Sequence, residues 1–339
     1  MWRGARQGAS TFNGSSFVYA GTVLDSVFFH CWPSWLKKLA GYTASDTPFA
    51  APTMAAEIDF PKLKQKALAE FLAMLLFVFI GAGSACGVAG SPGWVNQVAL
   101  TFGFAITCLA YTIGHISGGH INCAVTLGLT VAKLCPPVEA GVIFVAQMLG
   151  STCGAALLAI LHDSTSDATG GLGTNSLGPN ISAGQAVCGE VLMTFLLMYV
   201  VLETACNPKS AANGVNAPIA IGFAVFLAHS VLIPIDGCSI NPTRSFGPAV
   251  VMTGRGSAGQ WNDHWIFWLG PCLGSVLAVG AFKLINPEWS PPGPEPEPEP
   301  EPEPVKIVVP EPEPAPKAPE PQELATSPAE EATLCGLST

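Results

Sequence analysis

The fold is decided by the stretch SGGHINCAV, residues 117–125, together with its partner GCSINPTRSFGP, residues 237–248. Each stretch sets one asparagine, Asn122 or Asn241, between a glycine-containing loop and a short apolar run. Asparagine is a strong helix N-cap, so both stretches predict the start of a short helix. The two asparagines are 119 residues apart, which makes them the matching centres of a repeat.

Other features recur at nearly the same distance. The triplet Gly-Phe-Ala occurs at 103–105 and again at 222–224, also 119 residues apart. Glu70 and Glu190 are 120 residues apart, and each lies near the start of a hydrophobic segment. Three pairs at almost one offset indicate an internal duplication.

Composition places the chain in a membrane. A length of 339 residues alone would suggest two domains, but hydrophobic residues make up 49% and charged residues only 11%. Ordinary globular chains carry about 25% charged residues, so these few cannot cover a soluble surface. Twelve acidic residues and two lysines lie from Glu288 onward, so the tail accounts for the whole net charge of −10. The remainder is neutral and offers no basic face to nucleic acid.

Six hydrophobic segments are each about long enough to cross a bilayer as a helix: 67–88, 95–113, 138–161, 183–202, 217–235 and 265–285. Two further apolar runs, 123–132 and 242–252, are too short to span and follow the two asparagine loops. We predict an all-α membrane protein with six transmembrane helices and two re-entrant half-helices.

Lysines predict the orientation. They precede the first segment or fall on the same side later, at Lys37, Lys38, Lys62, Lys64, Lys66, Lys133, Lys209 and Lys283. The opposite loops, 91–96 and 162–182, contain neither lysine nor arginine. Both termini are therefore expected in the cytoplasm, and the second repeat is inverted relative to the first. Asn180 then lies in an external glycosylation sequon, whereas the sequon at Asn13 would stay bare.

The predicted organisation has three parts. Residues 1–60 form a disordered cytoplasmic extension, with translation from Met54 as an alternative. A channel domain follows at 61–286, with repeats at about 66–162 and 183–285. Residues 287–339 form an acidic tail whose alternating glutamate and proline favour an extended, disordered spacer. A solvated tail is favoured over one that docks a cytoplasmic partner.

The chemistry lies in the two loops. If Asn122 and Asn241 meet at the bilayer midplane, their amides and two positive helix ends face one point of a pore. Water could accept from both amides, while cations would be repelled. Arg244, three residues after Asn241, keeps its charge in an apolar stretch, which points to a functional role.

These motifs, with HWIFWLGP at 264–271, resemble the aquaporin (major intrinsic protein) family over about 62–286. In that family each half carries an Asn-Pro-Ala box, so the resemblance implies midplane positions at Asn122, Cys123, Ala124, Asn241, Pro242 and Thr243. It also implies a selectivity filter made of Phe102, His229, Cys238 and Arg244. A homotetramer with one pore per subunit is implied by the resemblance alone.

The implied filter suits water. Arg244 and His229 would supply hydrogen-bond donors, and the bulk of Phe102 and His229 would exclude glycerol. Ser245, where glycerol-conducting relatives typically have aspartate, also follows the water-selective pattern. Cys238 is the candidate site of mercury inhibition. Glu70 and Glu190 are interpreted as buried carboxylates that hold loop backbone groups.

Both boxes depart from the family pattern, reading Asn-Cys-Ala and Asn-Pro-Thr. Proline suits the first position of a helix, so replacing Cys123 by proline is expected to preserve or raise stability and water permeability. Thr243 adds a hydroxyl where the short helices touch, which leaves permeability and proton exclusion open.

The leading function is passive, osmotically driven water conduction across the plasma membrane or an intracellular vesicle membrane. A pore for other small uncharged solutes or gases is an alternative, and a membrane scaffold or adhesion protein with a weakly conducting pore is another. An enzyme is not predicted, because the two buried glutamates lie in separate segments without a nucleophile. The eleven cysteines lack metal-ligand spacing, so no metal and no cofactor are expected.

Overall fold

A computed structural model describes residues 59–291, apart from the side chains of 211–213; the predicted N-terminal extension up to 58 and the tail from 292 onward lie outside the described residues. The described part is helical and contains no strand. Its α-helices are α3 (Phe60–Val88), α4 (Trp94–Ser117), α5 (Cys123–Val131), α6 (Pro137–Leu161), α7 (Ala183–Val201), α8 (Ala217–Asp236), α9 (Pro242–Gly254) and α10 (Ile266–Ile285).

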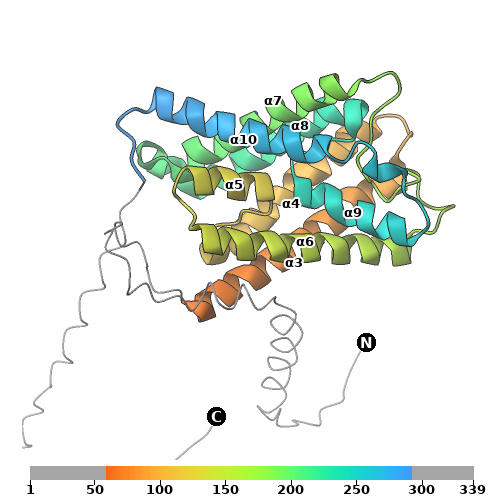
Figure 1. Ribbon diagram of the computed structural model, residues 1–339, viewed down its shortest axis with the longest axis horizontal. Coiled ribbons are helices and arrows are strands. Elements are labelled where there is room, and N and C mark those ends of the chain that lie inside the picture. The colour runs from red at the N-terminus through yellow and green to blue at the C-terminus, as the bar shows by residue number, and fades with distance from the viewer. Residues whose placement is uncertain (1–58, 292–339) are drawn as a thin grey trace, which may run out of the picture. The chain divides into compact units, whose positions relative to one another are not determined.

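The predicted fold class is confirmed. Six helical stretches are long and apolar enough to span a membrane, and the two short helices α5 and α9 follow the second and fifth of them. In Figure 1, α5 and α9 lie between α6 on one side and α10 on the other. The two half-helices therefore sit inside the bundle of longer helices.

Helix α3 begins seven residues earlier than the apolar pattern indicated, at Phe60 rather than Ala67. Asp59 caps it, with Oδ1 accepting from the Lys62 backbone N–H at 3.1 Å, and Pro61 occupies the first turn. Capping chemistry thus starts the helix before its hydrophobic face begins.

The C-terminal end of α7 carries structure that the sequence did not predict. A π-helical turn, Leu202–Cys206, leads into a 3₁₀ segment, Pro208–Asn216. The Glu203 carboxylate accepts from Asn207 Nδ2 at 2.8 Å and from Asn286 Nδ2 at 2.9 Å. This carboxylate ties the end of α7 to the end of α10.

Glycines allow the helices to pack closely. A Cβ at Gly154 of α6 would collide with the Leu75 carbonyl of α3, and one at Gly274 of α10 with the Val191 carbonyl of α7. Small residues at helix contacts are typical of membrane bundles. Gly154 and Gly274 are 120 residues apart, so the duplication extends to the packing.

The repeated Gly-Phe-Ala triplets meet where α4 packs against α8. A Cβ at Gly103 would lie 2.8 Å from the Gly222 carbonyl oxygen, and one at Gly222 would lie 2.7 Å from the Gly103 oxygen. An apolar groove of about 250 Å³ lies over this contact. Its eight lining residues form four pairs, each separated by 119 positions: Leu100 and Ile219, Gly103 and Gly222, Phe104 and Phe223, Thr107 and Phe226.

Candidate functional site

The two half-helices start at the asparagines. Asn122 Oδ1 accepts from the backbone N–H of Ala124 at 2.8 Å and of Val125 at 3.4 Å. Asn241 Oδ1 accepts from the backbone N–H of Arg244 at 3.3 Å. Both asparagines have extended backbone conformations and are buried, as N-caps of helices inside a bundle require.

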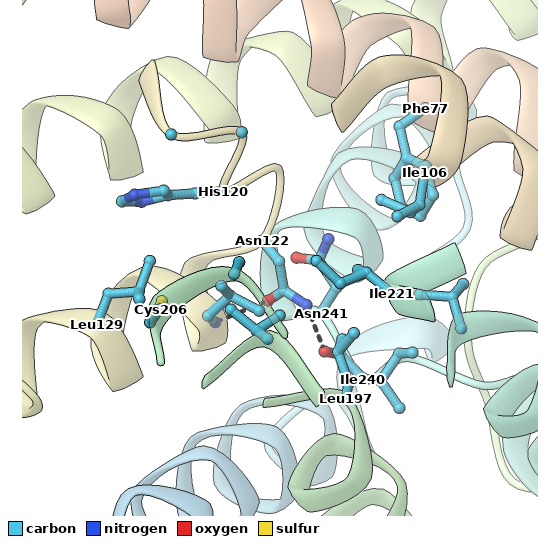
Figure 2. Close-up of a pocket in the computed structure, with 16 residues that line it drawn as sticks. Phe77, Ile106, His120, Asn122, Leu129, Leu197, Cys206, Ile221, Ile240 and Asn241 are labelled. Atoms are coloured by element: carbon cyan, nitrogen blue, oxygen red, sulfur yellow. Dashed lines mark hydrogen bonds between the residues drawn. The ribbon is translucent and has the colours of Figure 1, made fainter. Parts of the chain in front are cut away.

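Each asparagine also binds the loop of the other half. Asn122 Nδ2 donates to the Ile240 carbonyl at 2.7 Å, and Asn241 Nδ2 donates to the Ile121 carbonyl at 2.8 Å. Figure 2 shows the two side chains next to each other, with a dashed bond to Ile240. From sequence we expected both N–H groups of each amide to face the pore. In the structure each amide donates one of its two hydrogens to the other half, so one N–H per amide remains for a permeant.

The loops before the asparagines are held in an unusual conformation. Ile121 and Ile240 both have positive φ, 48° and 44°, which is rare for a β-branched residue. Such strain persists only where the surroundings impose it, and it turns the two carbonyls toward the opposite asparagines. The strained backbone of Ile121 and Ile240 therefore orients the two carbonyls that accept the hydrogen bonds across the repeat.

Two buried carboxylates hold these loops. Glu70 accepts from the backbone N–H groups of His120 and Ile121, both at 2.8 Å, and from Ser117 Oγ at 2.6 Å. Glu190 accepts from the equivalent N–H groups of Ser239 and Ile240, both at 2.6 Å. Both glutamates are fully buried.

Phe102, His229 and Arg244, from three different helices, form one cluster. The Phe102 and His229 rings stack with centroids 4.1 Å apart, and the Arg244 guanidinium carbon lies 5.1 Å from the Phe102 centroid. Only 1% of Phe102, 1% of His229 and 3% of Arg244 is exposed. The three side chains are therefore closely packed and almost fully buried.

The hydrogen-bond role expected for His229 needs correction. Its Nδ1 lies 2.9 Å from the Val225 carbonyl, which can only accept, so Nδ1 carries a hydrogen. In the neutral ring Nε2 is then an acceptor, not the donor expected from sequence. Nε2 has no protein partner among the described residues and is free for a permeant.

Arg244 is held by the loop between α6 and α7. Its Nη1 donates to the Gly173 carbonyl at 2.9 Å, while Nε has no partner among the described residues. Gly173 has φ 67°, and a Cβ there would lie 2.9 Å from the Ala82 Cβ. Only glycine fits that position without displacing a neighbour.

Asp167 shapes the same loop. Its Oδ2 accepts from the Leu172 N–H at 2.6 Å, and its Oδ1 accepts from the hydroxyl and backbone N–H of Thr169 at 2.7 and 3.0 Å. Burial tends to raise the pKa of Asp167, but these hydrogen bonds outweigh it and lower the pKa. Leu172 immediately precedes Gly173, so Asp167 helps to place the carbonyl that Arg244 uses.

Cys238 lies in the loop before Asn241. It has φ 57°, and its backbone N–H donates to Asp236 Oδ1 at 2.9 Å. The side chain is fully buried and lies near Arg244. Cys238, the fourth residue of the predicted filter, is thus buried in the loop that leads to Asn241.

A cavity of about 80 Å³ lies on the other side of the asparagines. Asn122, Asn241 and His120 supply polar groups, and most of the wall is apolar, including Phe77, Ile106, Leu129, Leu197, Val201, Ile221, Val225 and Ile240 (Figure 2). One water needs roughly 10–15 Å³ of such volume, so the cavity has room for a short file of waters.

Three contributors, Gln147, Ser275 and Asn175, were missed by sequence reasoning. Gln147 Nε2 donates to Glu70 Oε2 at 2.9 Å, Ser275 Oγ donates to the Ala124 carbonyl at 2.6 Å, and Asn175 Oδ1 accepts from Ser245 Oγ at 2.8 Å. All are buried polar side chains, and a glutamine inside an apolar span was a readable signal. The backbone carbonyl of Gly173 left no such signal.

Known proteins place the chain in one family. The family model "Major intrinsic protein" matches residues 57–282. The chain is 39% identical to a probable aquaporin PIP2-1 of Oryza sativa, covering 71% of this chain and 88% of the relative. It is 38% identical to aquaporin-1 of Bos taurus, covering 68% and 86%. An aquaglyceroporin structure from Plasmodium falciparum has a TM-score of 0.60 at 24% identity, covering 67% of this chain and 98% of that one, a likeness of fold.

The family match spans both half-helices, the first five long helices and α10 as far as Phe282. Members of this family are membrane channels and not enzymes. The chain belongs to the major intrinsic protein family and is an aquaporin-type membrane channel.

Proposed function

We propose that the chain is a water channel that excludes glycerol, ions and protons. The observation that carries this proposal is the constriction of Phe102, His229 and Arg244, with rings stacked at 4.1 Å. A single water can exchange its lost hydrogen bonds for the Arg244 Nε–H and the His229 Nε2 acceptor, both without protein partners in the described chain. A glycerol carbon chain would have to separate the stacked rings.

Ion exclusion rests on fixed positive charge. Arg244 cannot lose its proton at physiological pH, and a cation would meet it in a narrow, poorly hydrated passage. The N-termini of α5 and α9 add partial positive charge at the asparagines. Anions would lose their hydration shell at the apolar wall of the cavity.

Proton exclusion rests on the asparagine pair. Each amide keeps one N–H after its cross-repeat bond, so a water between Asn122 and Asn241 would accept from both. A water held as a double acceptor points its hydrogens away along the pore in both directions. A continuous donor chain for protons is then interrupted at that water.

The decisive experiment is stopped-flow light scattering on proteoliposomes with water and with glycerol, before and after mercuric chloride. Fast, mercury-sensitive water flux without glycerol flux supports the proposal. Cys238→Ser should remove the mercury effect, whereas Cys108→Ser, at an exposed position on α4, should leave it unchanged. Glycerol flux comparable to water flux would overturn the proposed selectivity, and water flux equal to that of empty liposomes, with the fold intact, would overturn the function.

The same proposal includes the arrangement in the membrane. The channel lies in the plasma membrane or a vesicle membrane, with both termini in the cytoplasm. Asn180 can carry a glycan because its side chain is exposed in the external loop. Large apolar side chains such as Leu72, Leu76 and Phe223 are exposed on the helices, as lipid or subunit contacts require. We propose a homotetramer because of the family to which the chain belongs. A measurement of the mass of the protein in detergent tests this proposal.

A further inference from the structure

The last residues of α4 and α8 are equivalent in the repeat but differ in chemistry. Ser117 ends α4 and Asp236 ends α8, 119 positions later, and each is followed by a glycine with positive φ. The Ser117 hydroxyl oxygen accepts from the Gly119 N–H at 3.1 Å, and Asp236 Oδ1 accepts from the Cys238 N–H at 2.9 Å. The two side chains therefore make one equivalent bond to the loop that follows.

The second bond is present in the first half alone. The Ser117 hydroxyl donates its hydrogen to Glu70 Oε1 at 2.6 Å. In the second half Asp236 Oδ2 is buried and has no hydrogen-bond partner within residues 59–291, and only 1% of Asp236 is exposed. A buried carboxylate oxygen without a donor is costly, and a hydrogen on that oxygen removes the cost by neutralising the group.

Glu190 has fewer donors than its equivalent Glu70. Glu70 accepts from four donors: two backbone N–H groups, the Ser117 hydroxyl and Gln147 Nε2. Within the described residues Glu190 accepts from two backbone N–H groups and from no side chain that a hydrogen bond identifies. A carboxylate has about four acceptor sites, so Glu190 can accept a further hydrogen.

Both side-chain donors of the first half have been replaced in the second. Gly154 of α6 and Gly274 of α10 are equivalent at 120 positions, so Gln147 of α6 corresponds to Phe267 of α10. Phe267 is fully buried and has no donor. Asp236 stands at the place of the serine, so it is the remaining side chain that can supply a hydrogen to the buried glutamate.

The two acids are held against one short segment of backbone. Asp236 and Glu190 together bind the N–H groups of residues 238–240. Successive Cα atoms are about 3.8 Å apart, so the two carboxyl groups lie close together in a region that water does not solvate. Two ionised carboxylates at such a site repel strongly. No ion pair joins Arg244 to either acid in the part of the chain that the structure describes.

We propose that Asp236 carries a hydrogen on Oδ2 and shares it with Glu190, as the Ser117 hydroxyl shares its hydrogen with Glu70. Oδ1 of the neutral carboxyl group still accepts the backbone N–H of the loop. The pair then holds one negative charge instead of two, and the glutamate gains the side-chain donor that it lacks.

The shared hydrogen makes Asp236 a positioning residue for the loop 237–241. The Ile240 carbonyl of this loop accepts from Asn122 Nδ2 at 2.7 Å, so the position of the loop also sets the position of the asparagine amide. This part of the inference rests on the proposed selectivity for water over protons. The shared hydrogen itself does not depend on what the channel conducts.

Infrared spectroscopy of the full chain in liposomes tests the hydrogen directly. A protonated carboxyl group has a C=O stretching band that is separate from the bands of ionised carboxylates and shifts in heavy water. At neutral pH the wild type should show this band. Asp236→Asn should lack it, because the amide donates to Glu190 and leaves that group ionised. Asp163→Asn, at an exposed aspartate, is the control and should keep the band.

A set of substitutions at position 236 tests the positioning role. Asp236→Asn and Asp236→Ser keep a donor, and the serine copies the first half, whereas Asp236→Ala removes the donor. Water flux per folded channel and proton leak are measured in proteoliposomes with an internal pH dye. The alanine variant should lower the ratio of water to proton flux by roughly threefold or more, the scale of coupling within one hydrogen-bond network. The asparagine and serine variants should keep the wild-type ratio.

The outcomes are distinct. Identical wild-type and Asp236→Asn spectra in the region of the protonated band would overturn the shared hydrogen, and this comparison does not need the alanine variant to fold. Equal flux ratios of the alanine, serine and asparagine variants would overturn the positioning role. Absence of water flux from folded wild-type protein would instead overturn the proposed function and leave the infrared result unchanged.

Discussion

Arg244 and Gly173 are joined by a 2.9 Å hydrogen bond from the guanidinium to the backbone carbonyl, across 71 positions of sequence. The bond fixes a buried charge in half-helix α9 to the loop between α6 and α7. The bond therefore sets the position of α9 relative to this loop. The Arg244 charge has a defined position because a loop outside the two boxes supplies its acceptor.

Replacing Arg244 by valine should open the constriction to cations. The variant removes the fixed charge, so water flux should persist while proton or sodium leak rises by about tenfold or more, equivalent to about 1.4 kcal/mol of lost barrier. Ion-dependent dye quenching in liposomes measures the leak. Arg255→Gln, on an exposed arginine at the end of α9 that binds the carbonyls of Ala159 and His162, is the control. A valine variant as tight to ions as wild type would contradict the role of the charge.

Replacing His229 by glycine should admit glycerol. The imidazole stacks on Phe102 at 4.1 Å, so its loss widens the constriction and removes one polar partner of water. Glycerol flux should rise from the liposome background by about tenfold, and water flux should change by less. Swelling in a glycerol gradient measures both. Glycerol flux that stays at background would show that another part of the passage sets the size limit.

Glu190→Gln should destabilise the protein. The carboxylate accepts two buried backbone N–H groups at 2.6 Å, and an amide can offer only one oxygen in its place. One N–H left unpaired costs about 1–3 kcal/mol, visible as a lower unfolding temperature in detergent. Glu288→Gln is the control, because Glu288 is 86% exposed in a 3.7 Å ion pair with Lys209. Equal stability of the two variants would refute the supporting role.

Two glycines of α6 should respond oppositely to alanine. Gly154→Ala places a methyl group against the Leu75 carbonyl of α3 and should cost about 1–3 kcal/mol through overpacking. Gly141→Ala meets no atom within 4 Å and should gain up to about 1 kcal/mol from helix propensity. Thermal unfolding of both variants decides this. Similar shifts in one direction would mean that helix propensity, not close packing, governs the α3–α6 contact.

Acid should loosen the loop that holds Arg244. Hydrogen bonds lower the folded-state pKa of Asp167 below its unfolded value of about 3.9. Its contribution to stability is therefore complete above about pH 4 and is lost as the pH falls through the lowered folded-state value. Water flux should stay constant from about pH 7 to about pH 4 and change only below that range. Asp167→Asn should show the altered flux already at neutral pH.

The matched control for the acid effect is Asp163→Asn in the same loop. The Asp163 carboxylate binds only Thr165 and Ser166, close to itself in sequence, and does not touch Leu172. Its substitution should leave flux unchanged at neutral pH. If both variants changed water flux equally, the Asp167–Leu172 contact would not be the cause of the change.

The fold could be predicted because its determinants are periodic. Hydrophobic segments of membrane-spanning length, an offset of 119 or 120 residues and capping asparagines are all readable from one sequence. The start of α3 was misplaced because the cap at Asp59 lies outside the apolar pattern. The π-turn Leu202–Cys206 depends on tertiary bonds of Glu203, which no local pattern encodes.

The site was harder to predict because its details depend on backbone groups and on contacts across the repeat. The residue type pointed to Arg244, whereas Phe102 and His229 were implied by the family resemblance, and the structure brings these three together. The hydrogen-bond role of His229 was wrong, since the Val225 carbonyl sets the tautomer. Thr243 was recognised as a variant, but the bond from its hydroxyl to Asn241 Oδ1 at 2.6 Å follows only from the three-dimensional arrangement.

The crossed bonds of the asparagines also bear on how the chain is made. Asn122 and its acceptor Ile240 are 118 residues apart, so the first half-helix is synthesised long before its partner loop exists. At about 5–20 residues per second, that delay is on the order of ten seconds. During this time the Asn122 amide has been synthesised but its acceptor, the Ile240 carbonyl, has not. The centre of the channel is therefore completed late in biosynthesis. A chain that stops before Ile240 leaves the Asn122 amide without this acceptor.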